Sequence, residues 1–138
     1  MNGFKVFSKT VHFETRRESE FVDLTQPAQE AVQESGVREG VLIAFAPHAT
    51  GVLVINENEP LLLEDVREAL SRLFPEEGHR HPANCHSHLK SLFLCPSRII
   101  PVTGGKLALG TWQSLLFMEA DTHGRRRSIL LRVIGSYG

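Results

Sequence analysis

The sequence predicts an α+β domain in which an antiparallel β-sheet layer packs against two to three helices. Short apolar runs and stretches of alternating apolar and polar residues fill most of the chain, so strands dominate. Two helical segments are separated in sequence from most of these strands, without the regular alternation of a doubly wound sheet. With 138 residues, 41% of them hydrophobic, the chain is expected to form one domain over residues 1–138.

In the N-terminal half, strands are expected at residues 4–14, in the segment FVDL, and at 41–46 and 51–56. A first helix follows Thr25, which stands where an N-cap is expected, and Gly36 supplies its C-terminal stop. A second helix begins at Pro60 and ends at Pro75. Its expected apolar face consists of Leu62, Leu63, Val66, Leu70, Leu73 and Phe74.

The C-terminal third predicts a three-stranded antiparallel meander over 98–102, 107–119 and 126–135, joined by the turns TGGK and DTHG. Trp112 and Gln113 are then neighbours on one strand and face opposite sides of the sheet. Trp112 is expected in the core rather than against a ligand.

Charge and composition exclude several classes of partner. Fifteen basic and sixteen acidic residues give a net charge of -1, so no overall field attracts nucleic acid or an anionic membrane. Neither a signal peptide nor an apolar run long enough to span a membrane is recognised, and a cytoplasmic location is expected. Cys85 and Cys95 do not form a C-x-x-C pair and are expected to be free thiols.

Four of the seven histidines lie in the segment HRHPANCHSHLK, residues 79–90. Apolar residues at helical spacing (Leu89, Leu92 and Phe93), with Asn84 as N-cap, predict a short helix over 85–94. In a helix, His86 and His88 point about 200° apart, whereas in a strand they share one face. The spacing matches no standard zinc signature, so a metal site and a polar loop both remain open on spacing alone.

Four segments, PHATGVLVINENEP, NCHSHLKSLFLCPSRIIPV, GGKLALGTWQSLLFMEAD and RRRSILLRVIG, resemble the YjbQ-like family, also called uncharacterised protein family 0047, in order and spacing. The resemblance covers almost the whole chain. It implies an α+β fold with an antiparallel sheet, a homotrimer, and a histidine cluster that forms a metal or active site near a subunit boundary. It also implies a secondary thiamine-phosphate synthase activity, which is described for some members.

The family pattern falls on His48, His81 and His88, which implies a divalent metal ion, with zinc favoured. His86 falls where many members carry Asp, and is expected to be a fourth ligand or a catalytic proton-transfer group. His79 falls outside the pattern and is expected on the surface.

The remaining candidates each have a structural alternative. Glu119 is expected to act as a general base or to pair with Arg125 or Arg127. Lys90 and the two arginines are expected to bind phosphate or to stay solvated. The resemblance places Asn56 and Glu57 at the rim of the site, although turn formers need no function. The expected substrate-binding residues are Asn56, Glu57, Asn84, Lys90, Gln113, Arg125 and Arg127.

The expected reaction joins a thiazole phosphate to a pyrimidine methyl diphosphate. The alternatives are a zinc-dependent hydrolase of a small phosphoester or other electrophile, and a non-catalytic trimeric module that binds a metal or small ligand. Ala49 replaces the threonine that follows His48 in the family. The replacement removes a hydroxyl next to His48, so the resemblance does not determine the identity of the substrate. The expected partners are further copies of the chain and a small phosphorylated substrate, with no nucleic acid and no membrane.

Overall fold

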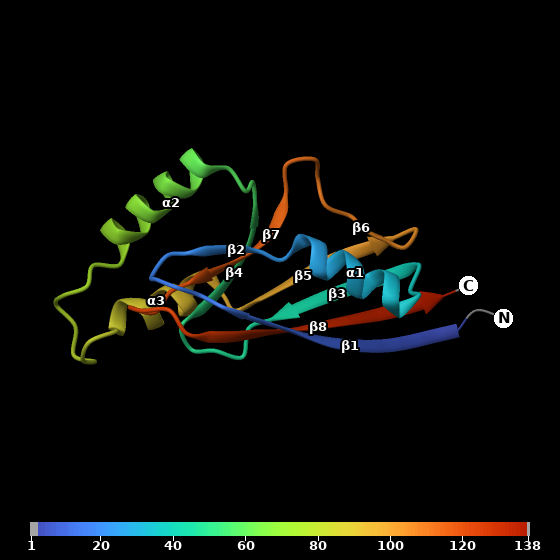
Figure 1. The fold of residues 1–138 in the computed structure, drawn as a ribbon, viewed down its shortest axis with the longest axis horizontal. Coiled ribbons are helices and arrows are strands. Elements are labelled where there is room, and N and C mark those ends of the chain that lie inside the picture. The colour runs from blue at the N-terminus through green and yellow to red at the C-terminus, as the bar shows by residue number, and fades with distance from the viewer. Residues whose placement is uncertain (1–2, 138) are drawn as a thin grey trace.

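The computed structural model of the protein describes residues 3–137, which form two antiparallel sheets and three helices (Figure 1). The predicted α+β class is therefore confirmed. The helices are α1 (Thr25–Ser35), α2 (Pro60–Leu73) and α3 (Cys85–Leu94). The strands are β1 (Gly3–Glu14), β2 (Phe21–Asp23), β3 (Glu39–Phe45), β4 (Gly51–Asn56), β5 (Ser97–Thr103), β6 (Lys106–Leu107), β7 (Ser114–Glu119) and β8 (Arg126–Tyr137).

The larger sheet has the strand order β1-β8-β3-β5-β6. Its first two strands are each 12 residues long and pair along their whole length, from Gly3 opposite Tyr137 to Glu14 opposite Arg126. Every second residue of β8 is buried, including Ile129 and Leu131, as expected for a strand with one face on the core. The two ends of the described chain therefore lie side by side (Figure 1).

The smaller sheet has the order β2-β7-β4, and β7 is buried on both of its faces. Leu115 and Phe117 belong to the main core that this sheet shares with the larger one. Leu116 and Met118 point the other way, toward α2. A strand covered on both faces needs apolar residues at successive positions, which explains the continuous run LLFM.

The predicted C-terminal meander is wrong. Within residues 107–119, a turn at Gly110, closed by its two hydrogen bonds with Gln113, separates β6 from β7. β5 pairs with β3 and β6, whereas β7 joins the smaller sheet. Trp112 lies on the connecting loop and is 71% exposed, so it is neither on a strand nor in the core. Apolar periodicity identifies strands but carries no information about their distant partners, which decide the sheet order.

α1 begins at Thr25 itself, so the predicted N-cap role of this residue is wrong. The N-cap is Leu24, and the Thr25 hydroxyl instead accepts a hydrogen bond from the Leu115 N–H, which fastens α1 to β7. Gly36 ends the helix with a positive φ of 74°, as predicted. No helix in the described part of the chain is both long and apolar enough to cross a membrane.

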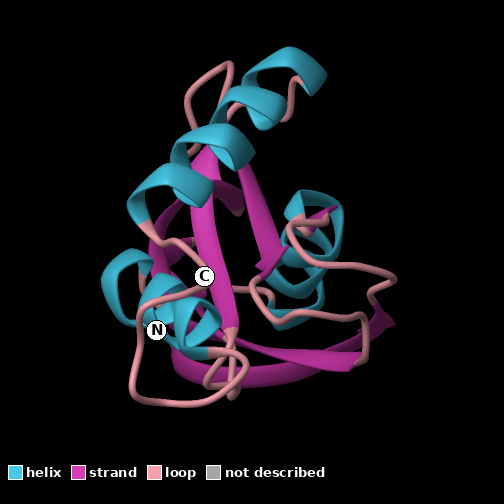
Figure 2. Cartoon of the chain, turned by 90° about the vertical axis from the view of Figure 1, so that its left-hand side faces the viewer, coloured by secondary structure: helices cyan, strands magenta, loops and turns pink. Residues whose placement is uncertain are grey.

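α2 and α3 lie at the end of the molecule opposite the termini, flanking the strands (Figures 1 and 2). Both have the predicted bounds, but part of each expected apolar face is exposed. Leu73 of α2 is 69% exposed, and Leu92 and Phe93 of α3 are 73% and 71% exposed. α3 instead buries a polar face, made of His86, Ser87, Lys90 and Ser91. Asn84 stands at its N-cap position but makes no side-chain capping bond.

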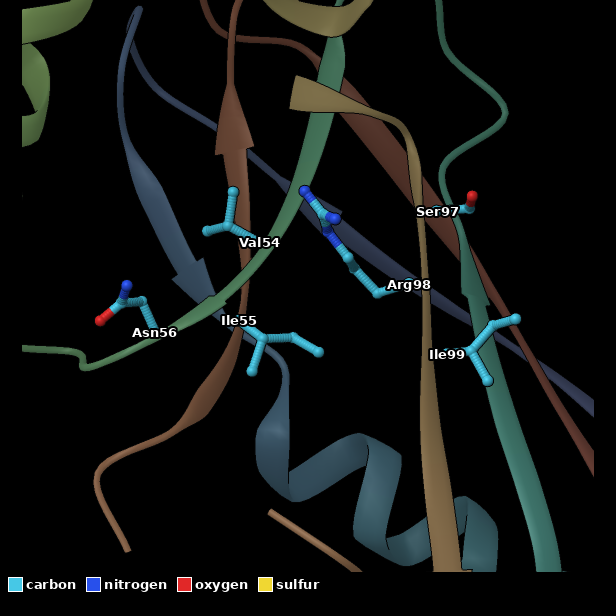
Figure 3. Close-up of a pocket in the computed structure, with 6 residues that line it drawn as sticks. All are labelled: Val54, Ile55, Asn56, Ser97, Arg98 and Ile99. Carbon is cyan, nitrogen blue, oxygen red and sulfur yellow. The ribbon is translucent and has the colours of Figure 1, made fainter. Parts of the chain in front are cut away.

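The two sheets separate between β4 and β5, where Arg98 bridges them (Figure 3). Its Nε donates to the Leu53 carbonyl at 2.7 Å, and its Nη2 donates to the Leu94 carbonyl. Beyond this bridge the two strands leave an open groove of about 660 Å³, with Ile55 on one side and Ile99 on the other. Arg98 therefore links β5 to β4 and to the end of α3.

Candidate functional site

A polar pocket of about 360 Å³ lies where β4 begins, β7 ends and α3 begins. It unites five predicted site residues: His48, Asn84, His88, Arg125 and Arg127. Thr50 and Asp121 also line it, although the sequence did not identify them. This pocket brings two of the three predicted metal ligands together with three predicted substrate-binding residues.

His48 stands on the loop between β3 and β4, with its Nε2 against the backbone of Ser128, 3.0 Å from the carbonyl oxygen and 3.1 Å from the nitrogen. Burial lowers the pKa of His48, and the positive charges of Arg127 and Arg125 act in the same direction. The imidazole is therefore neutral at pH 7. When Nε2 is unprotonated, it accepts a hydrogen bond from the Ser128 N–H. In the other tautomer, Nε2 donates to the Ser128 carbonyl and Nδ1 keeps a free lone pair for a ligand.

The other two predicted ligands lie together at the start of α3. The rings of His81 and His88 meet edge to face, with centroids 4.9 Å apart. The Nε2 of His81 also lies 3.2 Å from the Asn84 Oδ1. His79 lies apart, with its Nε2 2.6 Å from the Pro75 carbonyl oxygen, in keeping with its predicted surface position.

His48, His81 and His88 do not form a closed set of ligands. Among residues 3–137, the group of histidine, cysteine and acidic side chains whose ligand atoms all lie within 4.8 Å of one another is Glu18, Glu76 and His86. A cation is disfavoured there, because the Lys90 ammonium lies 3.2 Å from Glu18 Oε2 and already balances its charge. The histidines around the polar pocket therefore remain the better donor set.

The side of the polar pocket formed by β7 and β8 contains a buried ion pair between Glu119 and Arg127, which are 0% and 4% exposed. Glu119 accepts hydrogen bonds from Arg127 Nε at 2.8 Å, from Arg127 Nη2, and from the Thr15 hydroxyl at 2.6 Å. Burial alone raises the pKa of Glu119, but these bonds outweigh it and hold the pKa below its ordinary value. The geometry matches the predicted alternative in which Glu119 pairs with an arginine, and Arg127 is not solvated.

Asp121 is a second buried carboxylate of the pocket, 2% exposed. It accepts hydrogen bonds from the Thr50 hydroxyl at 3.1 Å and the Asn84 amide at 3.4 Å, and pairs with Arg125 at 3.2 Å. It therefore fixes three side chains that line the pocket. The sequence holds a signal for it, because Glu119 and Asp121 stand two residues apart at the end of an apolar strand and are expected on one face.

His86 and Lys90 do not reach the polar pocket. Both are almost fully buried on another side of α3, with His86 Nε2 and Lys90 Nζ within 3.1 and 3.2 Å of the same Glu18 oxygen. Lys90 is thus neither solvated nor free to meet a phosphate. Glu18 lies in the charged turn TRRESE, and no sequence pattern distinguishes it from its neighbours.

Asn56, Glu57 and Gln113 lie at the far end of the smaller sheet. Asn56 ends β4 and is opposite Ser114, whereas the polar pocket lies near Gly51, at the start of that strand. Five residue steps along a strand cover about 17 Å. Within one chain, these three predicted substrate-binding residues are therefore separated from the histidines.

The sequence profile described as "UPF0047 protein YjbQ-like" matches residues 9–136. A UPF0047 protein of Archaeoglobus fulgidus is 41% identical over 120 residues, covering 84% of this chain and 93% of that protein. The UPF0047 protein YugU of Bacillus subtilis is 32% identical over 131 residues, covering 92% and 98%. A crystal structure of a YbjQ-like protein of unknown function from Sulfolobus solfataricus matches with a TM-score of 0.93 at 32% identity, covering 96% of this chain and 99% of that one. The chain therefore belongs to the UPF0047 family of YjbQ-like proteins.

Proposed function

We propose that this protein is a metal-dependent enzyme that acts on a small phosphorylated substrate in the polar pocket. One observation carries the proposal: a neutral imidazole at His48, the imidazole of His88 and the guanidinium groups of Arg125 and Arg127 line the same pocket. Neutral imidazoles are metal ligands, and guanidinium groups are donors suited to phosphate oxygens.

The types of donor suit zinc or a similar transition metal, which prefers imidazole nitrogen to the carboxylate and water ligands typical of magnesium. His48, through Nδ1, would hold the ion together with His81 and His88. A bound zinc ion supplies Lewis-acid chemistry to the pocket. The Ser128 carbonyl orients the His48 ring from behind, the usual role of an outer hydrogen-bond partner. His81 is exposed and its ring already contacts that of His88, so turning its side chain toward His48 displaces no buried group.

Arg125 is the main cation available to an anionic substrate. Its side chain is 41% exposed at the pocket, and its pairing with Asp121 fixes the direction of the guanidinium group. Arg127 is 4% exposed, and its charge is balanced by Glu119, so it contributes less. Asn84, held by Asp121, adds a neutral hydrogen-bonding group beside them.

The family resemblance directs the proposal toward a thiamine-phosphate synthase-like condensation. The thiazole nitrogen attacks the pyrimidine methylene carbon, and the carbon–oxygen bond to the diphosphate breaks, releasing pyrophosphate. Arg125 faces the negative charge that develops on this leaving group. Hydrolysis of a small phosphoester is the second candidate, because both arginines are already paired with carboxylates, which suits a single phosphoryl group better than a diphosphate.

The proposal includes assembly into the homotrimer implied by the family. The outward face of the larger sheet supports it, since a sheet face that meets water normally carries polar residues. Leu42 and Ala44 of β3 point into the core, so its alternate residues, Val41, Ile43 and Phe45, point outward. On the neighbouring strands, Ile134 is opposite Val41, Leu130 is opposite Phe45 and Ile99 is opposite Ile43. Contact with another copy would remove this apolar surface from water.

The experiment measures thiamine phosphate and pyrophosphate after incubation of the zinc-supplemented protein with thiazole phosphate and pyrimidine methyl diphosphate. We expect both products from the wild type and from a His79→Ala variant, the matched histidine control, and at least a hundredfold lower rate from His88→Ala. Release of orthophosphate from a simple phosphoester, without condensation, would support the hydrolase. Retention of metal without either reaction would overturn the enzymatic proposal and leave a binding module.

A further inference from the structure

A second cavity lies between α2 and the smaller sheet, away from the polar pocket. It has a volume of about 140 Å³ and almost entirely apolar walls. The sheet contributes Phe21, Leu116 and Met118. The helix contributes Leu63, Val66 and Leu70. Walls of this kind favour an apolar group over water.

The mouth of the cavity is polar and lies at the end of β4. Asn56 and Glu57 line it there, and the Asn56 Oδ1 accepts a hydrogen bond from the Glu57 N–H at 2.8 Å. No residue in the described part of the chain donates to the Glu57 carboxylate. An apolar cavity thus opens at a carboxylate that is free to receive a donor from outside the chain.

Size and charge together define the occupant. An engineered cavity of about 150 Å³ with similar walls takes up benzene, so this cavity has room for one six-membered ring. A carboxylate at its mouth attracts a cation and repels an anion. A ligand with a ring at one end and an ammonium group at the other would match both features.

We propose that this cavity binds a small aromatic or branched alkyl amine, with the apolar group under α2 and the ammonium at Glu57. The site goes beyond the proposed function, because it involves no metal and shares no lining residue with the polar pocket. It also gives Asn56 and Glu57 a role that they cannot have at the polar pocket of the same chain.

Three ligands of equal size separate the contributions of ring and charge: benzylamine, benzyl alcohol and benzoate. The chain has two methionines, so the ¹³C-labelled methyl group of Met118, in the cavity wall, gives an easily assigned NMR signal. We expect benzylamine to shift this signal and to bind about fivefold more tightly than benzyl alcohol, with benzoate weakest.

Glu57→Gln should reduce the affinity for benzylamine to that for benzyl alcohol and leave the alcohol unchanged. Val66→Phe should fill the cavity and abolish the binding of all three ligands. Leu61→Ala is the control, because Leu61 lies on the same helix, is 69% exposed and does not line the cavity. The proposal is overturned if no ligand shifts Met118 at millimolar concentration, if benzoate binds as well as benzylamine, or if Glu57→Gln changes nothing. Since Glu57 is at the cavity mouth, this last variant tests the site even if Val66→Phe fails to fold.

Discussion

The buried pair of Glu119 and Arg127 gives the sharpest prediction about stability. In Glu119→Gln the negative charge disappears, and the buried Arg127 guanidinium keeps only neutral acceptors, among them the Thr50 hydroxyl and carbonyl. Removing one partner of a buried ion pair costs about 3–5 kcal/mol, because the other charge is left without compensation. For a domain of this size we expect the unfolding midpoint to fall by about 10–15 °C.

Urea and thermal unfolding, followed by circular dichroism, measure this loss. Glu14→Gln is the matched control, because Glu14 of β1 pairs with Arg126, the neighbour of Arg127 on β8, at 3.5 Å, with side-chain exposures of 72% and 92%. Such an exposed pair contributes about 0–1 kcal/mol. If Glu119→Gln destabilises the protein no more than Glu14→Gln does, the account of a charged pair that organises the pocket is wrong.

Three further predictions concern pH, α3 and assembly. The folded protein holds the pKa of Glu119 below its ordinary value of 4.5. The stabilising effect of the Glu119 carboxylate is therefore full above pH 4.5 and is lost as the pH falls through the folded pKa. The difference in urea midpoint between wild type and Glu119→Gln should shrink below pH 4.5. Glu18→Gln removes the charged partner of the Lys90 ammonium, which is 3% exposed, and should lower the free energy of unfolding in urea by about 2 kcal/mol. Glu20→Gln, on the same turn, should lower it less. Equal losses would argue against a stabilising pair of Glu18 and Lys90. Ile99 is 64% exposed on the larger sheet, and Ile99→Asp should yield smaller particles in analytical ultracentrifugation. Leu61→Asp, on α2, should not. An unchanged sedimentation coefficient for Ile99→Asp would contradict assembly through the outward face of the larger sheet.

Local patterns were sufficient to predict most elements of the fold. Pro60 at the start of α2, Gly36 at the end of α1 and the alternation in β1 each act over a few residues, and the structure agrees with all three. The order of the strands depends instead on contacts between distant residues. The sequence predicts β7 as part of a C-terminal meander, yet it pairs with β2 and β4 in the smaller sheet.

In the candidate site, too, local patterns predict less than contacts between distant residues decide. The family resemblance grouped His48 with His88, although 40 positions separate them in the sequence. Both residues line the same pocket. The sequence left open whether His86 and His88 share one face, as in a strand, or lie about 200° apart, as in a helix. The segment is helical, and His86 is buried away from the polar pocket that His88 lines. The role of Glu18 could not be predicted, because only the fold brings the β1–β2 turn against α3.

The metal content of protein purified without chelators tests the central claim most directly. Elemental analysis should give about one zinc or similar transition-metal ion per chain for the wild type and for His79→Ala, and should give little or none for His88→Ala. A wild type without metal, or a His88→Ala variant that keeps it, would contradict the assignment of His48, His81 and His88 as the ligands.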